Sequence, residues 1–236
     1  MLIPSIDLMG GKIVQLVQGK TKALEFDNFE QWVERFSIFP LIQLIDLDAA
    51  LGSGSNHQLV QYFVERLPCQ VGGGIRSIPA AQEILELGAK RVIFGSSLIR
   101  AGQINTGFAK EAAEKIGPER LVFALDSKEG KVAIRGWREL TEITPLQMIR
   151  ALDSGCAAFL YTHIDTEGMM LGIPLQTVRA LRQATSKQLI VAGGISSERE
   201  VQTLDSLSVD AVVGMALYLG KFPLSQGNSL PAPSKR

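Results

Sequence analysis

The chain has 236 residues, 24 Lys plus Arg against 24 Asp plus Glu, and 46% hydrophobic residues. This composition is typical of a compact soluble domain, and it excludes disordered, collagen-like and disulfide-based chains. The balanced charge provides no overall field to attract nucleic acid or an acidic membrane, so we expect neither as a partner. An anionic ligand would have to be held by local groups.

The cysteines and the N-terminal segment exclude further classes of protein. Cys69 and Cys156 lie in separate apolar segments and lack the spacing of a redox centre or a zinc site, so we expect buried free thiols and no metal. Met1 to Lys12 has no cationic start and carries Pro4 and Asp7 in its first apolar run, unlike a signal peptide. We expect a cytoplasmic protein with no cofactor.

Short apolar runs alternate with helical patterns along residues 1–222. Near-continuous hydrophobicity is typical of parallel strands that are covered on both faces. Eight such runs predict strands at Leu2–Leu8, Leu41–Leu47, Cys69–Val71, Arg91–Phe94, Leu121–Leu125, Ala157–Tyr161, Gln188–Ala192 and Val209–Val213. Apolar residues three and four apart predict helices at Phe29–Phe36, Gln58–Leu67, Ile78–Leu87, Gln103–Ile116, Pro145–Ser154, Leu175–Ala184 and Glu198–Leu204. This alternation predicts a single α/β domain, a (β/α)8 TIM barrel.

Three segments fit the alternation less well. Leu16 to Asn28 is too polar for a core element, so we predict a mobile loop after the first strand. Ala216 to Lys221 leaves room for a single turn as the eighth helix. The Ser-, Pro- and Gly-rich residues 223–236 predict a frayed tail.

Three motifs recur at a common offset of about 120 residues. Each copy ends a predicted strand, so the chain is predicted to consist of two related half-barrels. The pairs are Ile6-Asp7 with Leu125-Asp126, Gly73-Gly74-Ile75-Arg76-Ser77 with Gly193-Gly194-Ile195-Ser196-Ser197, and Val92-Ile93-Phe94-Gly95 with Ala211-Val212-Val213-Gly214.

The repeated glycines predict two phosphate sites. Barrel active sites are built at the C-terminal ends of the strands, and glycines before a helix start let backbone amides approach an anion closely. Neighbouring strands would form one cradle at each end of a bis-phosphorylated small-molecule substrate. The residues assigned to phosphate binding are Gly73, Gly74, Gly95, Ser96, Gly172, Gly193, Gly194, Gly214 and Met215.

The duplicated carboxylates Asp7 and Asp126 would face one another between the cradles. Two carboxyl groups can divide acid and base work when their environments separate their pKa values, although a single strand-end Asp is usually a cap. No Lys closes an apolar strand for a Schiff base and no Ser/His/Asp order is apparent, so isomerase or lyase chemistry remains.

At this point the sequence resembles a known family, the aldose–ketose isomerases of histidine biosynthesis. The resemblance covers residue 1 to about 222 and rests on motifs in a fixed order. The sister cyclase family usually carries Cys-Leu-Asp where Ser5-Ile6-Asp7 stands and lacks the Arg-Gly-Trp loop. The motifs are Ile3-Pro4-Ser5-Ile6-Asp7-Leu8, Gly11-Lys12, Val17-Gln18-Gly19, Ile45-Asp46-Leu47-Asp48-Ala49-Ala50, Val71-Gly72-Gly73-Gly74-Ile75-Arg76, Ala124-Leu125-Asp126, Gly130 to Trp137, Val191-Ala192-Gly193-Gly194-Ile195 and Val213-Gly214.

The resemblance implies an Amadori rearrangement of the phosphoribosylformimino-aminoimidazole carboxamide ribotide. Asp7 would take a proton from the sugar carbon beside the imine, with Asp126 as its acid partner. Thr162 would orient the opened sugar, and Trp137 would stack on the heterocycle. The implied substrate-binding residues are Gly19, Arg76, Arg135 and Trp137.

The segment Tyr161 to Gly168 departs from the family pattern. Many relatives carry an acidic residue where His163 stands and Asp where Glu167 stands, and some use that Asp as the proton donor. The acid role therefore stays open between Asp126 and Glu167. We expect His163 to be a hydrogen-bonded structural residue.

Two alternatives remain open. One is a dual-substrate isomerase that also acts on phosphoribosylanthranilate, although such relatives carry Arg where Gln15 stands. The other is a noncatalytic phosphosugar-binding barrel, which would not need to keep both Asp7 and Asp126. We expect a monomer.

Overall fold

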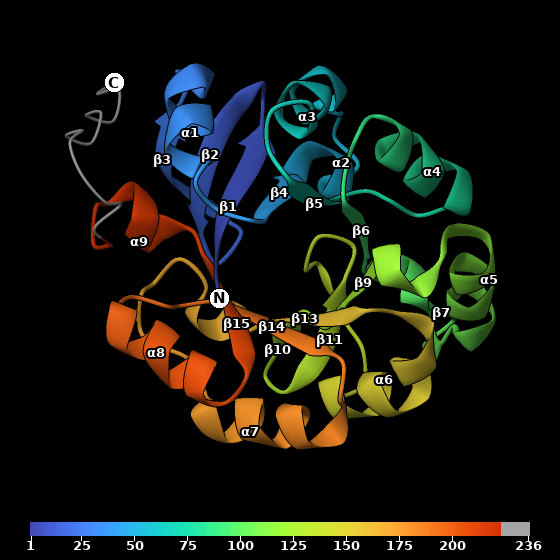
Figure 1. Cartoon of the computed structure of the whole chain (residues 1–236). Coiled ribbons are helices and arrows are strands. Elements are labelled where there is room, and N and C mark those ends of the chain that lie inside the picture. Colours follow the sequence, from blue (N-terminus) through green and yellow to red (C-terminus); the bar gives the residue numbers. More distant parts are fainter. Residues whose placement is uncertain (223–236) are drawn as a thin grey trace.

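The computed structural model describes residues 1–222, so the predicted tail at 223–236 lies outside the described residues. Eight parallel strands form a closed barrel with helices around it, which confirms the predicted (β/α)8 fold (Figure 1). The barrel closes because β15 pairs with β1. The barrel strands, in their order around the ring, are β1 (Leu2–Met9), β4 (Ile42–Asp46), β5 (Cys69–Gly72), β6 (Arg91–Phe94), β9 (Leu121–Ala124), β13 (Ala158–Thr162), β14 (Gln188–Ala192) and β15 (Val209–Val213).

The outer helices begin where capping residues stop the preceding loop. Ser77 and Ser197 accept hydrogen bonds from backbone amides at the starts of α4 and α8, and Thr144 forms a capping box with Gln147 at the start of α6. None of the described helices is long and apolar enough to cross a membrane. The helices are α1 (Phe29–Phe36), α2 (Leu47–Leu51), α3 (His57–Val64), α4 (Ile78–Glu86), α5 (Thr106–Ile116), α6 (Pro145–Leu152), α7 (Leu175–Ala184), α8 (Glu198–Ser206) and α9 (Met215–Tyr218), with 3-10 turns η1 (Ser96–Leu98), η2 (Pro118–Arg120), η3 (Asp153–Gly155) and η4 (Ile164–Thr166).

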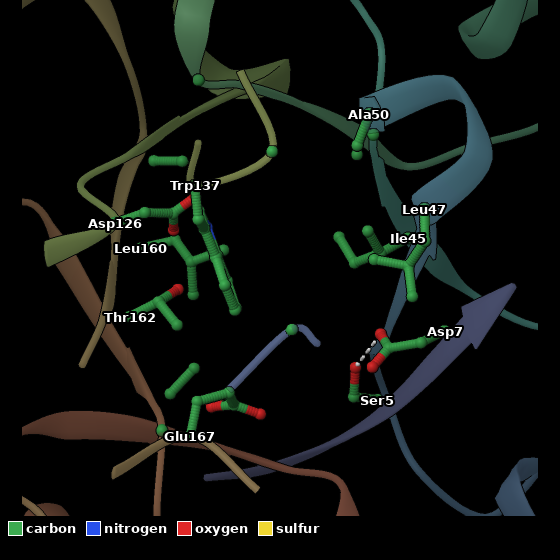
Figure 2. Close-up of a pocket in the computed structure, with 18 of the residues that line it drawn as sticks. Ser5, Asp7, Ile45, Leu47, Ala50, Asp126, Trp137, Leu160, Thr162 and Glu167 are labelled. Carbon is green, nitrogen blue, oxygen red and sulfur yellow. Dashed lines mark hydrogen bonds between the residues drawn. The ribbon is translucent and has the colours of Figure 1, made fainter. Parts of the chain in front are cut away.

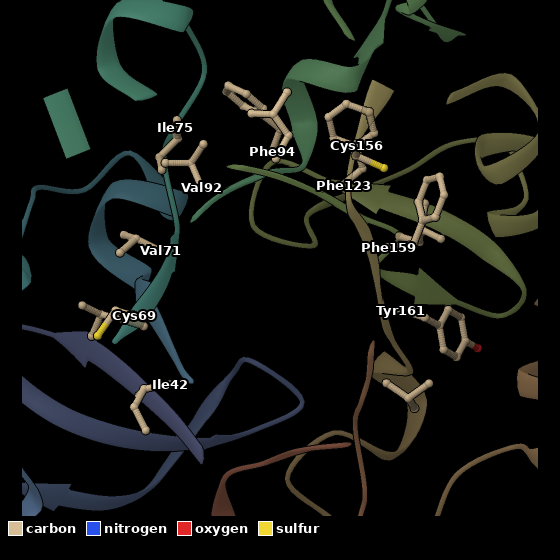
Figure 3. Packing of buried hydrophobic residues seen from close by; sticks show 14 of the residues in the cluster. Ile42, Cys69, Val71, Ile75, Val92, Phe94, Phe123, Cys156, Phe159 and Tyr161 are labelled. Carbon is tan, nitrogen blue, oxygen red and sulfur yellow. The ribbon is translucent and has the colours of Figure 1, made fainter. Parts of the chain in front are cut away.

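The hydrophobic core has two parts, one on each face of the barrel wall. The larger lies between strands and helices and contains Phe94, Phe123 and Phe159 (Figure 3). It also contains Cys69 and Cys156, which are buried free thiols as predicted. The smaller part fills the barrel interior with short aliphatic side chains. Side chains of successive strand residues alternate between these two regions.

The segment predicted to be a loop after the first strand is a β-hairpin, so that prediction was wrong. β2 (Lys12–Val17) pairs antiparallel with the end of β1, and β3 (Thr21–Phe26) pairs with β2. Its polar residues are compatible with a strand because Lys12 and Lys22 form ion pairs with Glu25. Charged side chains are typical of an edge strand.

Other short strands also lie outside the predicted elements. The segment after β9 folds into a small sheet of β10 (Ser127–Lys128), β11 (Lys131–Ile134) and β12 (Glu139–Leu140). β7 (Ile99–Arg100) and β8 (Gln103–Ile104) form a second hairpin, so α5 begins at Thr106 rather than at Gln103. Asn105 caps that helix by accepting a hydrogen bond from the Phe108 amide.

A chain of polar side chains crosses the base of the barrel, where the strands begin. The Arg91 guanidinium donates to Gln188 at 2.6 Å and to Gln70 at 2.8 Å. Gln70 donates to Gln43 at 3.0 Å, and Gln188 donates to Asp210 at 2.6 Å. These hydrogen bonds join β4, β5 and β6 to β14 and β15 across the interior.

Candidate active site

A cavity opens at the C-terminal ends of the strands, the end where barrel enzymes place their active sites. Asp7 lies on one side of it and Asp126 with Thr162 on the other, while Glu167 approaches from a third direction (Figure 2). The apolar floor includes Ile45, Leu160 and Val212. The sequence thus placed the repeated carboxylates correctly at the mouth of the barrel.

Asp7 projects from β1 into the cavity. The Ser5 hydroxyl, two residues earlier on the same strand face, donates to Asp7 Oδ1 at 3.0 Å. Burial raises the pKa of Asp7 to about 6, and the hydrogen bond from Ser5 opposes part of this shift. The Tyr218 hydroxyl donates to the backbone oxygen of Ser5 at 3.0 Å, which fixes this part of the strand.

Asp126 follows β9 and has two donors. Trp137 Nε1 donates to Asp126 Oδ2 at 2.9 Å, and the Thr162 side chain also donates to this carboxylate. Burial raises the pKa of Asp126, while both hydrogen bonds favour its charged form and lower it. The net effect is a raised pKa, because burial outweighs the two hydrogen bonds.

Glu167 differs from both aspartates in its electrostatic surroundings. It follows the turn η4 and lines the cavity. Burial, together with the negative charges of Asp7 and Asp126, raises the pKa of Glu167 to about 8. A carboxyl group with this pKa keeps its proton at neutral pH.

The two predicted cradles repeat each other in backbone geometry. Gly73 and Gly193 have φ of 94° and 103°. A Cβ on Gly73 would collide with the backbone carbonyl of Asp46, and a Cβ on Gly193 with that of His163. Gly95 and Gly214 share another conformation, with ψ of −94° and −101°. All four glycines, with Gly74, Ser96, Gly194 and Met215, line the cavity. A side chain at Gly73 or Gly193 would prevent this close backbone packing.

The structure brings some predicted binding residues to the cavity and leaves others outside. Gly19, Arg76 and Trp137 line it. The Arg135 guanidinium instead forms an exposed ion pair with Glu139 at 3.1 Å, outside the cavity lining. Gly172 also lies behind the lining, where its amide donates to the Gly194 oxygen at 2.9 Å.

His163 lies outside the cavity lining, on the opposite face of β13's end from Thr162. It forms an isolated bridge with Ser127 and a 3.3 Å hydrogen bond between its Nδ1 and the Tyr161 hydroxyl. Burial lowers its pKa, although Asp165 opposes this shift. These contacts match the structural role expected for His163.

Ser5 and Gln15 line the cavity but are not among the catalytic or binding residues predicted from the sequence. The alternation of strand side chains offered a signal for Ser5, because it lies two residues before Asp7. Gln15 comes from the hairpin that the sequence did not predict, and its side chain lies against Gly214 in the second cradle.

Comparison with known protein families gives a match over nearly the whole chain. The family described as "Histidine biosynthesis protein" matches residues 1–223. The chain belongs to this family.

Three relatives are similar to this chain over almost their full length. A Methanosphaera stadtmanae protein is 37% identical over 233 residues, covering 94% of this chain and 96% of its own. A Methanocaldococcus jannaschii protein is 34% identical (95% and 96% covered), and a Thermus thermophilus protein is 36% identical (96% and 98% covered). Each is named 1-(5-phosphoribosyl)-5-((5-phosphoribosylamino)methylideneamino) imidazole-4-carboxamide isomerase.

Proposed function

We propose that this family member is an aldose–ketose isomerase of histidine biosynthesis. Its substrate is the bis-phosphorylated phosphoribosylformimino-aminoimidazole carboxamide ribotide, which it converts to the phosphoribulosyl form. The names of the relatives support this reaction. The observation that carries the proposal is a single cavity with Asp7 facing Asp126 and Glu167, placed between two glycine cradles.

The cradles would hold the substrate at both ends. The amides of Gly73, Gly74 and Gly95 with the Ser96 hydroxyl would bind one phosphate, and those of Gly193, Gly194 and Gly214 the other. Helix starts add favourable partial charge, since α4 and α8 begin just after these glycines. The sugar that reacts would then lie between the carboxylates.

The first chemical step opens the sugar ring. We assign the proton donor to Glu167, because its raised pKa keeps the carboxyl group protonated at neutral pH. Its proton passes to the ring oxygen as the bond between that oxygen and the anomeric carbon breaks, which leaves a protonated imine. The nitrogen supplies the electron pair for the new carbon–nitrogen double bond.

The second step moves a proton from carbon. Asp7, ionised above about pH 6, takes the proton from the sugar carbon beside the imine. The electrons of that carbon–hydrogen bond form the carbon–carbon double bond of an enol-amine, and the electron pair of the carbon–nitrogen double bond returns to nitrogen. The enol-amine becomes the ketone when Asp7 returns its proton to the former imine carbon and the enol hydroxyl gives its proton to the Glu167 carboxylate, which restores both groups. Asp126 accepts hydrogen bonds from Trp137 and Thr162 and orients these groups toward the substrate.

The residues of the cavity favour neither of the two alternatives considered from the sequence. A dual-substrate enzyme would need a cation for the anthranilate carboxylate, but Gln15 at that position is neutral and donates its amide to the Val14 oxygen at 3.0 Å. A noncatalytic barrel would have no need for three carboxyl groups with different surroundings.

Assays of the purified protein with both aminoaldose substrates test the proposal. Turnover of the imidazole carboxamide ribotide, with little or none of phosphoribosylanthranilate, is the expected result. Absence of turnover with the ribotide would refute the proposal, and comparable turnover of both compounds would establish the dual-substrate alternative.

A further inference from the structure

The tip of the β2–β3 hairpin is a tight turn with an unusual residue in it. Gln18 and Gly19 have φ of 49° and 66°, and the Lys20 amide donates to the Val17 oxygen at 3.0 Å. This is the pattern of a type I′ turn, whose first central position favours Asn, Asp or Gly. Gln is not among the residues that this turn favours, so contacts outside the turn must account for its side chain.

Gln18 makes two hydrogen bonds to the segment that carries Glu167. Its backbone amide donates to the backbone oxygen of Glu167 at 2.9 Å, and its side-chain Nε2 donates to the backbone oxygen of Asp165 at 3.0 Å. The backbones also approach closely, because a Cβ on Gly168 would collide with the Leu16 carbonyl. The hairpin tip and residues 165–168 therefore form one packed unit.

Residues 165–168 have little regular structure of their own. The turn η4 ends at Thr166, Gly168 has φ of 70°, and Met170 has φ of 55°. The Glu167 amide donates to the backbone oxygen of Ile164, just before the segment, at 3.1 Å. The position of the Glu167 carboxyl group thus depends on contacts from outside the segment.

The charges around Glu167 favour its displacement when it ionises. The titratable groups that face it across the cavity are Asp7 on β1 and Asp126 after β9, both acidic. The residues just before it contribute His163 and Asp165. The hairpin contributes uncharged Leu16, Gln18 and Gly19, and the end of β14 contributes Gly193 and Gly194. Repulsion from the two aspartates would drive a Glu167 carboxylate toward water.

We infer that Gln18 is a positioning residue for the reaction, which holds residues 165–168 so that Glu167 stays in the cavity. Gln18 itself does not line the cavity, whereas Glu167 does. The inference goes beyond the proposed function but rests on the proton-donor role that we assign to Glu167.

Three variants separate the side-chain bond from the turn. Gln18→Gly keeps the left-handed backbone and the hydrogen bond from its backbone amide to Glu167, but it removes the side-chain hydrogen bond to Asp165. Gln18→Asn favours the turn even more, yet its amide is one methylene too short to make the same contact. Lys20→Ala is the matched control, because Lys20 is an exposed residue of the same turn.

We expect Gln18→Gly and Gln18→Asn to lower kcat about tenfold, the loss expected for one misplaced hydrogen-bonded group. KM should change by less than about twofold, because the phosphate cradles are intact. The alkaline limb of the pH profile should move to lower pH in both variants, as Glu167 becomes more accessible to water. Lys20→Ala should match the unaltered enzyme, and unchanged kcat and pH profile in Gln18→Gly would overturn the inference.

A double-mutant cycle distinguishes positioning of Glu167 from a general structural effect. In a Glu167→Gln background, Gln18→Gly should lower kcat by less than about twofold further, because both changes act through one group. Multiplicative losses would overturn the inference.

The proton-donor assignment is tested separately by Glu167→Gln alone. If that variant keeps near-native kcat, the assignment fails, and amide hydrogen exchange then decides the role of Gln18. Faster exchange at Glu167 and Met169 in Gln18→Gly than in Lys20→Ala would still show that Gln18 holds the segment. Equal exchange rates would refute it.

Discussion

The indole of Trp137 and the carboxylate of Asp126 are joined by a 2.9 Å hydrogen bond inside the cavity. The same indole lies against Gly19 at the hairpin tip, where a Cβ would be 2.7 Å from its ring. Trp137 has φ of 65°, a left-handed conformation that is unfavourable for a bulky residue. The ring is thus held in the cavity by contacts with two loops.

Replacing Trp137 with Phe should weaken binding of the substrate or product by about 1 to 3 kcal/mol, the range for stacking one base on an aromatic ring. Titration calorimetry with the product measures this loss. Ligand binding to the unaltered protein should also change the fluorescence of Trp137. This change should be absent in the variant, because the remaining Trp32 is buried against Tyr218, with ring centroids 4.3 Å apart. Unaltered affinity would show that Trp137 serves only to pack the two loops together.

Asp7→Asn should lower kcat by about a hundredfold or more, because it removes the base while keeping its shape. Product affinity, measured in the same variant, should persist. Ser5→Ala is a useful companion: it removes the hydrogen bond that lowers the pKa of Asp7, so the acid limb should move to higher pH with only a modest loss of kcat. Near-native turnover in Asp7→Asn would show that the base is another residue.

The pH dependence of kcat should be bell-shaped. Activity should rise through about pH 6 as Asp7 ionises and fall through about pH 8 as Glu167 loses its proton. Glu167→Gln should lower kcat and abolish the alkaline limb while keeping the acid limb. An alkaline limb that survives in this variant would assign it to a different group.

Glu167 should also make the stability of the protein depend on pH. Its pKa is raised from 4.5 to about 8 on folding, so its favourable contribution is complete below pH 4.5 and is lost as pH rises to about 8. Between pH 5 and pH 9 the melting temperature should therefore fall less in Glu167→Gln than in the unaltered protein. Calorimetric scans of both proteins at several pH values provide the comparison, and parallel curves would contradict the raised pKa.

Ser96→Asp should raise KM about tenfold or more, because it places a carboxylate in the first cradle. Ser96 suits this test better than Gly74 or Gly194, where a Cβ would approach backbone oxygens of Ala49 or Gly172 to 2.7 or 2.6 Å and disturb the fold. Crystals soaked in phosphate should show an anion in both cradles of the unaltered protein. Occupancy of one cradle alone would argue against a substrate with two phosphates.

The barrel strands were predictable because each is a short apolar run, and the helices because their apolar spacing is regular. The hairpin was not, since β3 carries exposed Lys22 and partly buried Glu25 beside apolar Leu24, and it is stabilised by pairing with β2 and by the ion pair of Glu25 with the distant Lys12. The short helix α2 was also missed, although Asp46 caps its start and Gly52, with φ of 72°, ends it. Those two residues were a usable signal.

The site was predictable to the extent that it is duplicated. Asp7 and Asp126 were found because they recur with their neighbouring glycines. The distinct character of Glu167 depends on burial and on charges brought from β1 and β9, which only the closed barrel places together. The outward orientation of Arg135 likewise depends on its pairing with Glu139, four residues along the chain.

The polar side chains across the base of the barrel have a consequence for how substrate enters and product leaves. Gln43 forms part of the cavity floor, and its bond to Gln70 begins the chain that continues through Arg91 and Gln188 to the far wall. Because these side chains span the base of the barrel, substrate and product use the same opening at the C-terminal ends of the strands. The product must leave before the next substrate enters, and accumulated product will therefore compete directly with substrate for the empty enzyme.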